Sequence, residues 1–126
     1  MQYEELTKKI IGCAFDVYNE MGYGFLESVY EKCMLIELRK KGLSARAQQP
    51  VTVYYHNDNV GEFKCDIIVD NKIIIELKSV RQIIKDHKVQ LVNYLTATHK
   101  DVGLLVNFGE KKVDIKRKVR KLSDIM

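Results

Sequence analysis

Two short segments joined by a turn constrain this sequence more than any other feature. Residues 63–69 and 72–77 are rich in β-branched and aromatic side chains, and Asp70-Asn71 between them is typical turn chemistry. We therefore expect a hairpin of two strands. Its first strand carries one acidic residue, Asp66.

The second strand of the hairpin ends in the triplet Glu76-Leu77-Lys78. Because successive side chains of a strand point to opposite faces, Glu76 and Lys78 share one face and Leu77 lies on the other. The core-facing row of this strand is predicted to be Ile73, Ile75 and Leu77. On the first strand, Asp66 belongs to the less apolar row, which alternates with Cys65, Ile67 and Val69.

The length of the hairpin loop decides whether the two acidic residues meet. A two-residue loop would pair Asp66 with Ile75 and leave Glu76 on the opposite face. A three-residue loop, residues 70–72, pairs Asp66 with Glu76 and needs one residue at positive φ, for which Asn71 is well suited. We predict the three-residue loop.

Carboxylates that face each other across two strands repel and destabilise the pair. A divalent cation compensates this repulsion, because Mg²⁺ is commonly held by one or two carboxylates. The alternative is that Asp66 pairs with Lys64, Lys78 or another lysine on a solvated strand face. The hairpin by itself favours the solvated face, and the metal site becomes the favoured interpretation only with the motifs described below.

Length and composition fit one globular domain, residues 1–126, with 46% apolar and 30% charged residues. No apolar run approaches the roughly 18 residues of a membrane span. Residues 1–9 are too polar for a signal peptide. We expect a cytoplasmic protein that does not enter a membrane.

The three cysteines, Cys13, Cys33 and Cys65, are odd in number and widely spaced within apolar segments. Buried reduced thiols are the expected state. The chain has no Cys-x-x-Cys pair, and its histidines show no ligand spacing with the cysteines, so the sequence does not predict a zinc site.

The net charge of +4 is concentrated at one end of the chain. Residues 111–126 carry seven basic and two acidic side chains, a net +5, which leaves −1 for residues 1–110. Such a segment can neutralise phosphates, and it can equally be an ordinary solubilising tail. Its basic residues are Lys111, Lys112, Lys116, Arg117, Lys118, Arg120 and Lys121.

Apolar periodicity predicts an α/β fold. The expected helices are residues 3–20, 26–41 and 86–98, and the expected strands are 51–56, 60–69, 72–77, 102–108 and 113–115. A turn is expected at residues 57–59. Because a helix separates the third and fourth strands, these two strands can be parallel, which predicts a mixed central sheet flanked by helices.

The motif Gly24-x-x-Glu27-x-x-Tyr30 stands upstream of the acidic hairpin. With residues 87–95 and the strand 103–108, these motifs make the sequence resemble the GxxExxY family within the PD-(D/E)XK nuclease superfamily. The resemblance covers nearly the whole chain. It implies a restriction-endonuclease-like αβββαβ core with an extra N-terminal helix.

The resemblance also implies the site residues. Asp66 and Glu76 would bind Mg²⁺ or Mn²⁺, with Glu27 as a further ligand, and Lys78 would orient and activate the attacking water. Gln90 would complete the catalytic set.

Several other residues carry two interpretations. For Tyr30 and Tyr94 we favour packing, although each can share a helix face with Glu27 or Gln90 respectively. His87 can contact phosphate or stabilise the start of its helix, and the structural role is favoured. Phosphate contact and plain surface charge are equally compatible with the two remaining basic residues, Arg81 and Lys85.

The function implied is hydrolysis of nucleic-acid phosphodiester bonds, with DNA as the expected substrate. The alternative is a non-catalytic module that keeps the nuclease fold and binds nucleic acid or protein. A small phosphoryl hydrolase is a third class, but no acid for its leaving group is evident. Because specific nucleic-acid interfaces bury about 1,000 Å² or more, a homodimer or a guiding protein partner is plausible for so small a domain.

Overall fold

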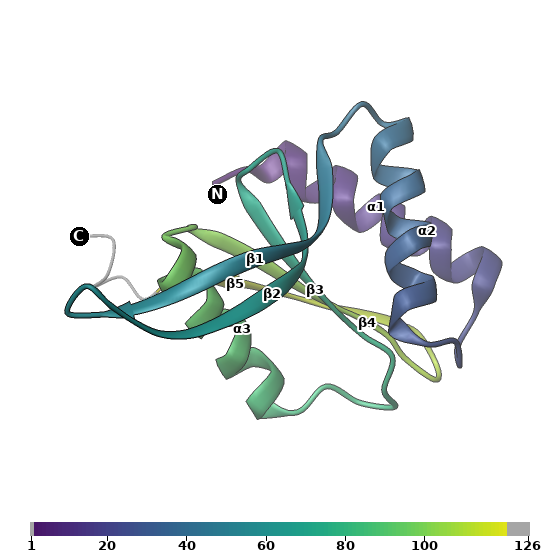
Figure 1. The fold of residues 1–126 in the computed structure, drawn as a ribbon. Helices are drawn as coiled ribbons and strands as arrows, with labels where there is room; N and C mark the ends of the chain where they lie inside the picture. Colours follow the sequence, from purple (N-terminus) through teal and green to yellow (C-terminus); the bar gives the residue numbers. More distant parts are fainter. Residues whose placement is uncertain (1, 121–126) are drawn as a thin grey trace.

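The structure is a computed structural model and describes residues 2–120. Two helices come first and are followed by three strands, a third helix and two further strands (Figure 1). The elements are α1 (Glu4–Met21), α2 (Glu27–Lys40), β1 (Ala45–Tyr55), β2 (Asp58–Val69), β3 (Ile73–Lys78), α3 (Lys85–Thr98), β4 (Val102–Phe108) and β5 (Val113–Val119).

The five strands form one sheet in the order β1-β2-β3-β4-β5. β3 and β4 are parallel, and the other neighbouring pairs are antiparallel. Helix α3 supplies the crossover that joins the two parallel strands, as parallel pairing requires. The predicted α/β fold with a mixed sheet and a leading helix is confirmed.

Helices α1 and α2 pack against one face of the sheet, and α3 packs against the other (Figure 1). On α1 the buried positions Ile10, Ala14 and Val17 recur at helical spacing, which places them in one apolar stripe. On α3 the stripe is narrower and consists of Leu91 and Leu95. The sheet is therefore buried on both faces at its centre.

The interior strand β4 is buried at all seven of its residues. This agrees with the near-continuous apolar run expected of a strand covered on both faces. Gly103 lies where α3 packs closely on the strand: a Cβ at this position would approach Leu91 Cδ1 to 2.8 Å and Leu95 Cδ2 to 3.2 Å.

Strand β1 begins six residues earlier than the expected 51–56, so Pro50 lies inside the strand and does not open it. The sheet tolerates a proline there because β1 is an edge strand, with one side free of ladder partners. The following turn lies at His56 and Asn57, both at positive φ, and not at residues 57–59. Such a two-residue turn matches the twist of a hairpin.

The hairpin between β2 and β3 has the predicted three-residue loop. Val69 lies opposite Ile73, and Lys72 N–H donates to the Val69 carbonyl at 2.9 Å. Asn71 has φ +55, as expected, and Asp70 has φ +52.

Cys65 departs from the row predicted for β2. Ile67 packs with α1 and α2, whereas Cys65 packs in the cluster beneath α3. The register places Gln48 of β1 opposite Asp66, and Gln48 has φ +52, which interrupts the regular pairing of the two strands. The alternation of side chains therefore fails at Asp66.

Three residues of the basic segment, Lys116, Arg117 and Lys118, lie in β5, which extends to Val119 and not only to Ile115. Arg120 continues it and forms an ion pair with Asp101. Lys121 and Asp124 lie outside the described residues. The three cysteines are free thiols, as predicted, and Cys13 and Cys65 are fully buried, whereas Cys33 is partly exposed.

Membrane insertion was not expected from the sequence. Within residues 2–120, no helix combines the length and the apolar character that crossing a membrane requires.

Replacing Gly103 by valine tests the close packing of α3 on β4. The added carbons would collide with Leu91 and Leu95, and overpacking of this kind costs about 1–3 kcal/mol of unfolding free energy. Urea denaturation should report that loss. Gly61→Val is the matched control, because no atom lies within 4 Å of a Cβ there. Equal stabilities of the two variants would contradict this account of the packing.

Candidate active site

The backbone of each strand of the β2–β3 hairpin binds a carboxylate of the other strand. Regular pairing runs from Val69 opposite Ile73 to Ile67 opposite Ile75. At the next position Leu77 N–H donates to Asp66 Oδ2 at 2.7 Å, and Asp66 N–H donates to Glu76 Oε1 at 3.3 Å. Carboxylate oxygens thus occupy the places that main-chain carbonyls occupy in a regular ladder.

This exchange fixes the two acidic side chains against each other. The register set by the three-residue loop places Asp66 across from Glu76, as predicted, because the sum of paired positions stays constant along the ladder. Each carboxylate is oriented by a backbone amide of a well-packed strand. The pair is consequently preorganised and does not depend on flexible side chains alone.

Glu76 is almost fully buried, with 7% of its surface exposed. Burial, followed by the nearby charge of Asp66, raises the pKa of its carboxyl group to about 8. The charge of Lys78 acts in the opposite direction and lowers this pKa. Without a further cation, the acidic pair therefore retains a proton near neutral pH.

Among residues 2–120, neither Asp66 nor Glu76 takes part in an ion pair. The alternative in which Asp66 is neutralised by Lys64 or Lys78 therefore finds no support. The two carboxylates face each other and, among residues 2–120, form no ion pair with a basic side chain. Carboxylate oxygens are the donors that Mg²⁺ and Mn²⁺ prefer. The residues present fit a divalent cation.

The described part of the chain contains no cluster of three or more His, Cys, Asp or Glu side chains suited to a metal ion. The candidate centre is accordingly a pair, Asp66 and Glu76. Glu27, the third expected ligand, is the first residue of α2 and is exposed to solvent. The structure brings it into no such cluster.

Helix α3 borders the acidic pair on its own side of the sheet. Tyr94 is half-buried and stacks on Phe63 of β2 with ring centroids 4.0 Å apart. Its hydroxyl accepts a hydrogen bond from Gln90 Nε2 at 2.8 Å, so these two residues share one helix face as expected. Burial, and then the charge of Glu76, raises the pKa of Tyr94.

Cys65 lies beside the acidic pair, but its thiol is expected to be unreactive. Burial is the main cause that raises the pKa of its thiol to about 12, and the charges of Glu76 and Asp66 add to it. A thiol with so high a pKa is a poor nucleophile and a poor metal ligand at neutral pH.

The remaining predicted residues lie around the start of α3. The His87 ring accepts a hydrogen bond from Ile84 N–H at 3.2 Å through Nδ1, which is a structural role at the helix start. Arg81 forms an exposed ion pair with Glu110. Lys85 opens α3 and lines a pocket of about 390 Å³ with Lys88 and Lys118, among other residues.

Two residues that sequence reasoning did not single out hold the segment that follows Lys78. Asn107 is 1% exposed; its Nδ2 donates to the Val80 carbonyl at 2.8 Å, and its Oδ1 accepts from Val80 N–H at 3.0 Å. Ser79 Oγ donates to the Phe25 carbonyl at 2.9 Å. The sequence feature that could have indicated the Asn107–Val80 contact is a single asparagine in an otherwise apolar strand.

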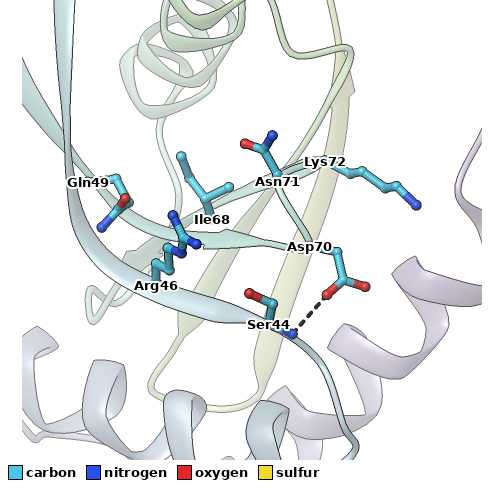
Figure 2. A pocket seen from close by; sticks show the side chains of 7 residues that line it. All are labelled: Ser44, Arg46, Gln49, Ile68, Asp70, Asn71 and Lys72. Carbon is cyan, nitrogen blue, oxygen red and sulfur yellow. Dashed lines mark hydrogen bonds between the residues drawn. The ribbon is translucent and has the colours of Figure 1, made fainter.

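A pocket of about 460 Å³ lies at the turn of the β2–β3 hairpin and not at the acidic pair (Figure 2). Arg46, Ile68 and Lys72 are among its lining residues. Asp70 fixes its wall: the Asp70 carboxylate accepts from Ser44 N–H at 2.8 Å (Figure 2). The pocket contains none of the predicted site residues, so we place the candidate active site by its chemistry.

Comparison with known proteins identifies the family and the fold of the chain. A family model described as the PD-(D/E)XK nuclease superfamily matches residues 4–119. The chain is also similar to the crystal structure of SSO0001, with a TM-score of 0.63 and 20% sequence identity. That likeness covers 98% of this chain but only 63% of the other, and it concerns the fold alone. No curated protein in the comparison matches.

Together with the family match, the five-stranded mixed sheet and its leading helix confirm the expected restriction-endonuclease-like fold.

The raised pKa of Glu76 predicts how the stability of the metal-free protein varies with pH. The unfolded chain loses this proton near pH 4.5, whereas the folded chain keeps it to about pH 8. The associated stability is therefore fully present below pH 4.5 and is lost as the pH rises to 8, a decrease of roughly 3–5 kcal/mol at most.

Urea denaturation in EDTA at pH 5 and pH 8.5 measures this decrease. Glu76→Gln should remove it, because an amide does not titrate, and Glu20→Gln on the exposed side of α1 should leave it unchanged. If wild type and Glu76→Gln lose equal stability between the two pH values, Glu76 does not hold the proton.

Proposed function

Since the chain belongs to the PD-(D/E)XK nuclease superfamily, we propose that it is a metal-dependent nuclease that hydrolyses phosphodiester bonds of DNA. The observation that carries the proposal is the pair of backbone-to-carboxylate hydrogen bonds, from Leu77 N–H to Asp66 and from Asp66 N–H to Glu76. These hydrogen bonds hold two carboxylates where a cation and a phosphate can meet.

Within the superfamily, we propose that the chain belongs to the GxxExxY family and that residues 1–126 form one nuclease-like domain. The motif residues support the family assignment. Tyr30 is fully buried, its hydroxyl donates to the Gly22 carbonyl, and Gly24 has φ +113, a conformation that favours glycine. These features require a tyrosine and a glycine at this spacing.

Asp66 and Glu76 would hold Mg²⁺ or Mn²⁺ through their carboxylate oxygens. When bound, the ion supplies positive charge that offsets the negative charge developing on the phosphate. The proton on the acidic pair would leave when a cation binds, because a bound cation favours the charged form of both carboxylates.

We propose that Lys78 acts on the same phosphate. It ends β3 two residues after Glu76 and therefore lies on the same strand face. Its ammonium group can donate to a phosphate oxygen and orient the attacking water.

Accessory roles fall to residues at the border of the acidic pair. We propose that Gln90, held by Tyr94, contacts the substrate or the attacking water. Glu27 would join the site only once nucleic acid or a cation is bound. The exposed basic residues Arg81 and Lys85 would contact phosphates, and His87 would keep its structural role.

Hydrolysis of labelled DNA in Mg²⁺ or Mn²⁺ tests the proposal. Asp66→Asn, Glu76→Gln and Lys78→Met should each lower the rate by about 100-fold or more, because the first two weaken the hold on the cation and the third removes a positive charge that stabilises the transition state. Lys64→Met and Glu62→Gln, on exposed positions of β2, are the matched controls and should cleave like wild type.

Single-stranded, duplex and branched DNA, and RNA, should all be tested as substrates. If wild type cleaves none of them but binds DNA, and the binding survives Glu76→Gln and Lys78→Met, the chain is a non-catalytic binding module.

Calorimetry with Mn²⁺ tests the metal centre separately from cleavage. At pH 7 the wild type should bind the ion and release up to one proton, because Glu76 starts largely protonated with a pKa of about 8. Titrations in two buffers that differ in ionisation enthalpy measure that proton. Asp66→Asn should abolish binding, and undiminished binding by this variant would remove Asp66 from the centre.

A further inference from the structure

The connection between α1 and α2, residues 22–26, presents three large apolar side chains to solvent. Tyr23 is 38% exposed, Phe25 45% and Leu26 75%. Scattered apolar residues on a surface are ordinary, but three within five residues form a patch, and patches mark interaction sites. We call residues 22–26 the aromatic loop.

Contacts with the core hold the backbone of the aromatic loop. Tyr30 is fully buried and stacks on Phe108, with ring centroids 4.2 Å apart and planes at 4°. Its hydroxyl donates to the Gly22 carbonyl and accepts from Phe25 N–H at 3.4 Å. The Phe25 ring rests edge-on against Tyr30, 6.1 Å between centroids. A partner that binds these rings would therefore lose little affinity to ordering the loop.

The aromatic loop contacts the segment that directly follows the acidic strand β3. The Phe25 carbonyl accepts from Ser79 Oγ at 2.9 Å, and Ser79 directly follows Lys78. Ser79 lies three positions after Glu76, a span of about 10 Å along an extended chain. This equals about three nucleotides of a stacked strand, at 3.4 Å each.

Basic side chains flank the same end of the sheet. The hydroxyl group of Tyr18, near the end of α1, donates a hydrogen bond to the Gly109 carbonyl. This contact joins α1 to the turn between β4 and β5. That turn carries the exposed Lys111 and Lys112, which line a pocket of about 350 Å³. The other charged residues of its lining are Arg81, Glu110 and Asp114. Within residues 2–120, neither lysine is in an ion pair.

Figure 1 shows the α1–α2, β3–α3 and β4–β5 connections gathered at this end of the molecule.

We propose that the aromatic loop binds unpaired bases of the nucleic-acid substrate by stacking on Phe25 and Tyr23, while Lys111 and Lys112 contact the adjoining phosphates. This inference rests on the proposed nuclease function and specifies its substrate as DNA with a single-stranded segment beside the cleaved bond. Proteins that bind single strands combine aromatic rings for the bases with cationic side chains for the backbone. Bases inside a duplex do not expose the faces that such rings need.

Binding is measured without cleavage, by fluorescence anisotropy in EDTA with three labelled DNAs: a 20-nucleotide single strand, a blunt duplex and a duplex with a single-stranded overhang. Phe25→Ala should weaken binding to the single strand and the overhang by about 5- to 150-fold, the range for one lost stacked base. Its effect on the blunt duplex should be under twofold. Phe25→Tyr keeps a ring and should bind like wild type.

Phe15→Ala is the matched control, because Phe15 on α1 is 48% exposed and lines a different pocket, between α1 and β5. It should change no affinity by more than twofold. Equal affinities of wild type and Phe25→Ala for the single strand, or equal losses in Phe15→Ala and Phe25→Ala, would overturn the inference. So would a Phe25→Ala variant that changes the oligomeric state in light scattering and leaves DNA affinity intact, because the loop would then bind a second copy of the chain.

Cleavage in Mg²⁺ separates this inference from the proposed function. If wild type and Phe25→Ala cleave equally and bind the single strand equally, the nuclease assignment stands and the aromatic loop is excluded as a base-binding surface. If Phe25→Ala weakens binding to the single strand but wild type cleaves no DNA, the loop binds bases and the nuclease assignment fails.

Discussion

The carboxylate exchange between β2 and β3 is the interaction on which the rest of the site depends. Asp66 accepts from the backbone of β3, and Glu76 accepts from the backbone of β2, so the two strands stay connected where their regular ladder ends. The register that permits this exchange is set by the loop at residues 70–72. That loop is held in turn by Asp70, whose N–H donates to the Ser44 carbonyl at 2.7 Å. The acidic pair is therefore positioned from a turn four residues away.

The same hydrogen bonds hold the carboxyl group of Glu76 in a buried position, where an ionised carboxylate is unfavourable. Burial of an ionised carboxylate is unfavourable unless it is hydrogen-bonded and neutralised, and Glu76 meets only the first condition. A proton or a cation can meet the second. The metal-free chain keeps the proton, at a stability that falls with rising pH, and a divalent cation would replace it. The raised pKa of Glu76 shows that the acidic pair is unfavourable in its fully ionised form, and a bound cation would remove this unfavourable energy.

Much of this arrangement could be predicted from the sequence because it depends on local rules. Apolar periodicity located the three helices and the all-buried strand β4. The positive φ of Asn71 and the opposition of Asp66 and Glu76 followed from loop length and strand alternation. Those rules failed where distant contacts decide. The left-handed Gln48 in β1 broke the alternation at Asp66 and sent Cys65 to the α3 side, which nothing within β2 could indicate.

The segment after Lys78 shows the same division between local and distant causes. Sequence spacing placed Tyr30 in the core, but its hydroxyl also holds the aromatic loop, and that contact spans eight residues. Asn107 holds Val80 across 27 residues, and Ser79 reaches Phe25 across 54. Each contact joins a different element to the few residues that follow the acidic strand.

A strand end tied to the α1–α2 loop, to β4 and to the β4–β5 turn has little freedom to move relative to any of them. The acidic pair, the β4–β5 turn that carries Lys111 and Lys112, and the aromatic loop are consequently held in a fixed relation by the fold. Fixed relative position is the property that a surface needs if it is to align one strand of nucleic acid with a cation centre.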